Sequence, residues 1–116
     1  MRYLDWEVIA PYSNHGDAVF VTAPGNMIWS TGKSNGGDYA RAYKLFNGTS
    51  AAAPFTSGVL ALMYAKYSAG QTRNRALVER MKAKLKASAD DLGPAGWDAL
   101  YGWGRVNARK SIVGTF

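Results

Sequence analysis

The residues with the clearest chemical potential lie between Asn47 and Pro54, where the chain reads NGTSAAAP. A small and apolar run follows, so the stretch predicts a helix that begins close to Ser50. Gly48 permits a sharp turn there and the close approach of another backbone. The free N–H groups and the macrodipole of a helix N-terminus favour negative charge. A serine in that position can attack a carbonyl carbon and donate its own backbone N–H to the oxyanion that forms.

A second interpretation of the same stretch is purely structural. Serine and threonine are common N-cap residues, because their side-chain oxygen accepts a backbone N–H from the first turn of the helix. Thr49 or Ser50 would then cap the helix without any catalytic role. A motif of this length does not decide between the two interpretations by itself, and both stay open at this point.

The elements expected around this serine combine one long helix with short strands. Residues 50–67 are mostly small and apolar, which predicts a helix buried nearly all round. Pro54 falls near its first turn, where a missing backbone N–H is least damaging. The apolar run Ala18–Val21 is bounded by turn formers and predicts a buried strand.

Two further short strands and a terminal helix complete the expected architecture. Residues 27–31 and 40–46 predict a hairpin that ends at Asn47, joined by an exposed loop over 32–38 that is rich in glycine and polar turn formers. Residues 106–112 predict a short last helix.

A basic segment predicts a surface helix over residues 73–88, with Thr72 as its N-cap. Its apolar residues recur every four positions, at Leu77, Met81 and Leu85. Seven of the fourteen basic residues lie between positions 66 and 86. We interpret them as the solvated face of this helix rather than a nucleic-acid site, because no aromatic residue is interleaved with them for base stacking.

Composition excludes several classes of protein. The chain has 116 residues, of which 47% are apolar and 19% charged, so it can bury a core. It contains no cysteine, which excludes disulfide scaffolds, cysteine-based zinc sites and thiol catalysis. The uncharged run 45–65 is too polar in its first half to span a membrane. Acidic residues near the N-terminus argue against a secretory signal peptide.

Three separated stretches resemble, in the same order, the C-terminal part of the catalytic domain of the subtilisin-like serine peptidases, the subtilases. The first is YSNHG followed by VFVTAPG within residues 12–25, and the second is GTSAAAP within residues 48–54 together with the helix after it. The third is YGWGRVNA at residues 101–108. The resemblance is clearest over residues 12–112 and identifies residues 1–116 as about the last third of such a domain.

This resemblance implies a three-layer α/β fold with a mainly parallel sheet between helices. It implies that Ser50 is the nucleophile, with its backbone N–H as one oxyanion donor, and that Asn47, Gly48 and Thr49 lie on the substrate-binding edge. The implied activity is endopeptidase hydrolysis of polypeptides through an acyl-enzyme, without a cofactor. The family allows for calcium, although no calcium site is identifiable in the sequence, and it favours an extracellular or cell-envelope location without a membrane span.

The chain also departs from the family pattern. Ala51 follows the nucleophile where the family often has methionine, and Phe55 follows the proline where it usually has histidine. The family's triad Asp and His lie upstream of the serine, yet their motifs are absent, and the single histidine, His15, falls in a surface loop. We therefore expect the N-terminal part of the domain as a partner. The alternative is a catalytically inactive remnant that acts as a structural or binding module.

Overall fold

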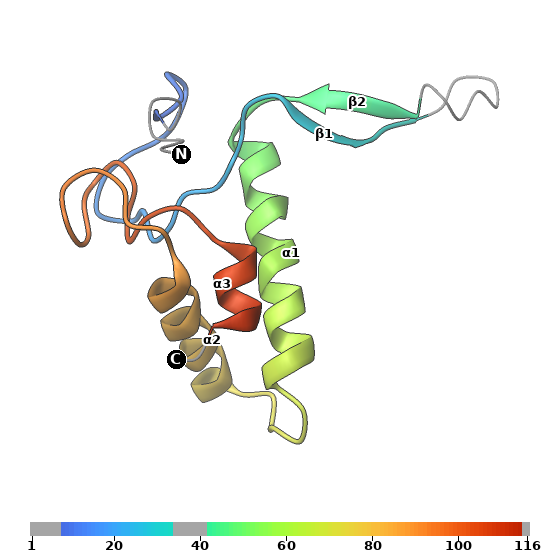
Figure 1. The fold of residues 1–116 in the computed structure, drawn as a ribbon, viewed down its shortest axis with the longest axis vertical. Coiled ribbons are helices and arrows are strands. Elements are labelled where there is room, and N and C mark those ends of the chain that lie inside the picture. Colours follow the sequence, from blue (N-terminus) through green and yellow to red (C-terminus); the bar gives the residue numbers. More distant parts are fainter. Residues whose placement is uncertain (1–7, 34–41, 115–116) are drawn as a thin grey trace.

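The computed structural model describes residues 8–33 and 42–114, which form a short hairpin and three helices (Figure 1). In chain order the elements are β1 (Ile28–Thr31), β2 (Tyr43–Phe46), α1 (Thr49–Tyr67), α2 (Arg75–Ser88) and α3 (Ala108–Val113). Figure 1 shows α2 and α3 beside α1, while the hairpin extends away from the N-terminal end of α1. No helix in the described ranges is long and apolar enough to cross a membrane.

The predicted hairpin is confirmed. Strands β1 and β2 pair antiparallel, with Ile28 opposite Phe46 at one end and Thr31 opposite Tyr43 at the other. The loop predicted for residues 32–38 lies largely outside the described residues. Because β2 ends two residues before α1 begins, the hairpin is fixed directly to the turn that carries the candidate serine.

The core lies where the three helices meet. The stripe predicted for α2 is confirmed, since Leu77, Met81 and Leu85 are each no more than 5% exposed. They pack against Val59 and Met63 of α1. Burial of this apolar stripe holds α2 on the other two helices, as expected for an amphipathic surface helix.

The prediction that the long helix is buried nearly all round is wrong for the described structure. Val59 and Met63 are the buried residues of α1, whereas Leu62 is 56% exposed and Phe55 is 39% exposed. The physical reason is that α2 and α3 cover one side of α1, and the described residues supply no neighbour for the rest of its apolar surface. The helix therefore presents apolar side chains to solvent.

The prediction of a buried strand over Ala18–Val21 is also wrong. This segment forms no strand and is half-buried at best. The carbonyl of Phe20 accepts the N–H of Trp103 at 2.8 Å, and an isolated parallel bridge joins Thr22, just after the segment, to Arg105. The N–H of Thr22 donates to Gly104 at 3.0 Å, and the N–H of Val106 donates to Thr22 at 2.9 Å. One neighbouring segment is present, but within residues 8–33 and 42–114 no second strand flanks it.

Asparagine, and not the predicted Thr72, caps α2. The side chain of Asn74 accepts the backbone N–H of Leu77 at 3.0 Å, and α2 begins at Arg75. Asn74 is the cap because it lies three residues before Leu77 and has extended backbone, which is the geometry of an N-cap residue. The short last helix is present as α3, with Asn107 as its N-cap.

Asp90 ties the segment before α3 to the end of α2. Its backbone exchanges two hydrogen bonds with Arg105, each 2.8 Å long. Its carboxylate accepts hydrogen bonds from Arg105 and Asn107 at 2.9 Å and from Lys110 at 2.5 Å. A buried hydroxyl pair, Ser88 and Ser111 at 2.7 Å, adds a second link between α2 and α3.

Some basic side chains of α2 lie over aromatic rings. The Nζ of Lys86 lies 3.2 Å from the centre of the Trp103 ring, and the Nζ of Lys84 lies 4.4 Å from that of Tyr67. Lys86 is exposed whereas Lys84 is half-buried. These lysines thus contribute cation–π contacts in addition to solvation.

Candidate active site

The turn before α1 places a glycine, not a hydroxyl residue, at the N-cap. Gly48 is the N-cap residue, with φ 127° and ψ 166°, and it makes no side-chain cap hydrogen bond. The structural interpretation, in which Thr49 or Ser50 caps the helix, is therefore wrong. A Cβ at position 48 would lie 3.3 Å from the Ser50 Oγ, and the backbone would be strained by the positive φ. Glycine leaves the hydroxyl unobstructed.

Ser50 is the second residue of α1 and is exposed. It lines a groove of about 530 Å³ between the hairpin and the first turns of α1, which we call the Ser50 groove. The other lining residues are Ile28, Trp29, Ser30, Thr31, Phe46, Ala51, Pro54 and Phe55. The hydroxyl therefore opens into an apolar groove with three aromatic walls.

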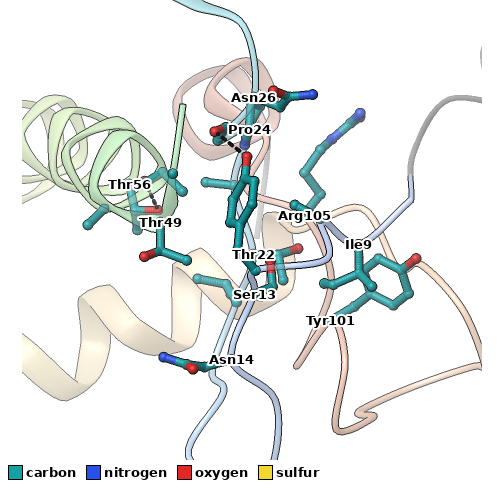
Figure 2. Close-up of a pocket in the computed structure, with 18 of the residues that line it drawn as sticks. Ile9, Ser13, Asn14, Thr22, Pro24, Asn26, Thr49, Thr56, Tyr101 and Arg105 are labelled. Atoms are coloured by element: carbon teal, nitrogen blue, oxygen red, sulfur yellow. Dashed lines mark hydrogen bonds between the residues drawn. The ribbon is translucent and has the colours of Figure 1, made fainter. Parts of the chain in front are cut away.

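Gly48 and Thr49 lie on the other side of the turn. They line a second cavity, also of about 530 Å³, together with Ala52 and Thr56 of α1 and the segments 8–14 and 21–26 (Figure 2). Figure 2 shows Thr49 and Thr56 on the α1 side of this cavity and Ile9, Tyr101 and Arg105 on the side away from α1. Of the four site residues predicted from the sequence, only Ser50 lines the Ser50 groove.

The side chain of Asn47 is engaged within the protein. Its Oδ1 accepts the backbone N–H of Met27 at 2.6 Å. Next to it, the N–H of Gly48 donates to the carbonyl of Gly25 at 2.7 Å. The sequence predicted Met27 as the first residue of a strand, but β1 begins at Ile28. The φ of Met27 is 54°, and it is the one non-glycine residue in the described ranges with a positive φ.

His15 is not brought into this site. It is exposed, in a loop that is held by a hydrogen bond from the N–H of Gly16 to the carbonyl of Ala99, and it lines neither the Ser50 groove nor the second cavity. Among the residues that the structure describes, no group of three or more acidic or histidine side chains could hold a metal ion.

The described residues combine helices and a strand pair, with an exposed serine in the N-terminal turn of a long helix and an apolar groove beside it. The family model of the subtilase family matches residues 5–104. The chain therefore belongs to the subtilase family.

Individual relatives agree with this membership. The chain is 36% identical over 110 residues to an extracellular serine protease of Serratia marcescens, and this match covers 81% of the chain but 10% of that protein. It is 37% identical over 105 residues to subtilisin DY of Bacillus licheniformis, covering 88% of the chain and 32% of that protein.

A solved structure extends the comparison to the fold. The crystal structure of a lanthipeptide protease superimposes with a TM-score of 0.74 at 32% identity, over 90% of this chain and 37% of that one. The predicted α/β fold class is thus confirmed, although the described residues contribute only one two-stranded sheet. The chain spans about a third or less of the two curated relatives.

Proposed function

We propose that this chain carries the nucleophile of a subtilisin-type serine endopeptidase. The observation that carries the proposal is the placement of Ser50, whose exposed hydroxyl opens from the first turn of α1 into the Ser50 groove. Family membership supports the reaction class, and a polypeptide is the substrate that this class implies. Asn47, Gly48 and Thr49 form the backbone turn that presents the serine.

The local chemistry supports attack by Ser50 on a carbonyl carbon. The first N–H groups of a helix have no intrahelical acceptor and carry partial positive charge. Because the N-cap residue Gly48 makes no side-chain hydrogen bond to the first turn, the amide of Ser50 can donate to the oxygen that becomes negative in a tetrahedral intermediate. Attack forms an ester between the serine and the acyl part of the substrate, the amine leaves with a proton, and water then hydrolyses the ester.

A serine hydroxyl needs a base to accept its proton, and in this proposal the base comes from another part of the catalytic domain. His15 is the single histidine of the chain, and it does not line the Ser50 groove. The family's histidine and aspartate motifs lie upstream of the serine, so we propose that the N-terminal part of the domain supplies them.

Two surfaces support the presence of such a partner segment. The first is the exposed apolar side of α1, which includes Leu62. The second is the free edge of the extended segment at Val21 and Ala23. Backbone groups of alternate residues point to opposite sides of a strand, and Thr22 uses its own groups to pair with 104–106. Those of Val21 and Ala23 therefore face away from this pairing, beside the second cavity.

The test is labelling by a fluorophosphonate, which reacts with an activated serine. The chain alone should not be labelled, whereas the chain combined with the N-terminal part of a subtilase domain should be labelled at Ser50 and should cleave casein. Ser50→Ala should abolish both signals, while His15→Ala, the matched control, should leave them intact. Equal losses in the two variants, or no labelling in any combination, would contradict the proposal and favour the inactive-module alternative.

A further inference from the structure

Asn47 stands at the point where the hairpin ladder ends. The last antiparallel pair is Ile28 with Phe46, so Met27 and Asn47 would form the next pair if the ladder continued. It does not continue, because Met27 has a φ of 54°, which lies in the left-handed region and outside strand geometry. The N–H of Met27 therefore has no backbone acceptor in β2, and the side-chain oxygen of Asn47 accepts it at 2.6 Å.

A second hydrogen bond lies directly beside the first. The N–H of Gly48 donates to the carbonyl of Gly25 at 2.7 Å, and the hydroxyl of Tyr12 donates to the same carbonyl at 3.1 Å. The two backbones approach so closely that a Cβ on Gly25 would lie 2.9 Å from the carbonyl oxygen of Gly48. We call the two bonds that join residues 25–27 to residues 47–48 the Asn47 clasp.

The clasp acts on the turn that carries the serine. Gly48 is part of the clasp and of the turn. Its N–H donates to Gly25 within the clasp, and its carbonyl accepts the N–H of Ala51 at 2.9 Å, which is the first hydrogen bond of α1. The backbone between these two bonds contains Ser50. Movement of Asn47 would therefore be transmitted over three residues to the serine hydroxyl.

We propose that Asn47 is a positioning residue for the Ser50 nucleophile, acting through its side-chain hydrogen bond to the backbone of Met27. The inference rests on the proposed function and refines it, because the family resemblance implied only that Asn47 lies on the substrate-binding edge. The Met27 side chain is 66% exposed, so packing of that side chain does not explain its left-handed backbone. The side-chain oxygen of Asn47 compensates for this backbone conformation, because it accepts the Met27 N–H that the conformation removes from the hairpin ladder.

The experiment compares Asn47→Ala, which removes the acceptor, with Asn47→Asp, which keeps an oxygen in the same place. Asn26→Ala is the matched control, because Asn26 is an exposed asparagine next to Met27. The first readout is hydrogen exchange at the Met27 amide, followed by mass spectrometry with residue resolution on the full chain. We expect exchange to be about tenfold faster in Asn47→Ala, the effect of losing one hydrogen bond, and unchanged in Asn47→Asp and in the control.

The second readout is kinetics of peptide hydrolysis by the chain combined with the N-terminal part of the domain. Misplacement of the nucleophile lowers kcat and leaves KM unchanged, so we expect kcat to fall by about tenfold or more in Asn47→Ala and to be rescued in Asn47→Asp. A rise in KM at constant kcat would overturn the proposal, because it would indicate that Asn47 binds substrate. Equal exchange at Met27 in wild type and Asn47→Ala would also overturn it.

The two readouts separate this inference from the proposed function. Hydrogen exchange needs no activity, so it decides whether the clasp exists even if the combined protein hydrolyses nothing. An active wild-type protein with unaltered Met27 exchange in Asn47→Ala would leave the peptidase proposal intact and refute the clasp.

Discussion

Among the glycines of the described residues, Gly104 has the least room for a Cβ, and its replacement by alanine should strongly destabilise the fold. A Cβ at this position would overlap the carbonyl oxygen of Asp90 and lie 2.7 Å from its carbonyl carbon. The φ of Gly104 is +114°, a backbone conformation that residues with a side chain rarely adopt. Asp90 and Arg105 exchange two backbone hydrogen bonds of 2.8 Å beside it, and both would have to open to make room.

The expected loss in the free energy of unfolding follows from the backbone conformation of Gly104 and from the two hydrogen bonds beside it. Left-handed backbone disfavours a residue with a Cβ by about 1–2 kcal/mol, and each lost hydrogen bond lowers the free energy of unfolding by about 1 kcal/mol. Gly104→Ala should therefore lose about 3–4 kcal/mol, a large part of the total for a small domain.

Two other glycines separate the contributions. Gly96 has a φ of +88° but no atom within 4 Å of an added Cβ, so Gly96→Ala should lose only the conformational part, about 1–2 kcal/mol. Gly58 lies within α1 with nothing within 4 Å, and Gly58→Ala should gain about 0.5–1 kcal/mol. Urea unfolding followed by circular dichroism at low protein concentration measures all three. Equal losses at positions 96 and 104 would refute the steric reasoning.

Further substitutions test three contacts around α2 and α3 by the same assay. Lys86→Gln should lose about 0.5–1 kcal/mol, because it removes the cation above the Trp103 ring, and Lys86→Arg should retain most of it; an unchanged Lys86→Gln variant would contradict this contact. Asp90→Asn should lose about 1 kcal/mol or more, and the loss should shrink in high salt; a loss independent of salt would argue against the ionic contribution. Ser111→Ala should lose about 1 kcal/mol by removing the hydroxyl pair with Ser88, and Ser88→Ala should lose no less, since Ser88 also bonds the Leu85 carbonyl.

Features set by local pattern could be predicted from the sequence. The spacing of Leu77, Met81 and Leu85 predicted the buried face of α2, because periodicity alone decides which side of a helix is apolar. The glycine before Thr49 and Ser50 and the small residues after them predicted where α1 begins.

Features that depend on residues distant in sequence could not be predicted. The run Ala18–Val21 has the composition of a buried strand, yet burial requires flanking strands that the described residues do not supply. The apolar surface of α1 is exposed for the same reason. The Asn47–Met27 hydrogen bond depends on a left-handed methionine, which no local preference favours, and the walls of the Ser50 groove arise only when the hairpin packs beside α1.

The parallel bridge between Thr22 and Arg105 has a consequence for the order of folding. The hydrogen-bonded residues Thr22 and Gly104 are 82 positions apart. Closing a loop of this length costs about 4 kcal/mol of conformational entropy, which the contacts formed afterwards must offset. Contacts within the hairpin and between adjacent helices close much shorter loops and should form first. Synthesis from the N-terminus delivers Trp103–Val106 only after Ser50 and its helix have left the ribosome. Closure of this bridge is therefore a late event, and until it occurs Phe20 and Val21 stay open to pairing with another chain.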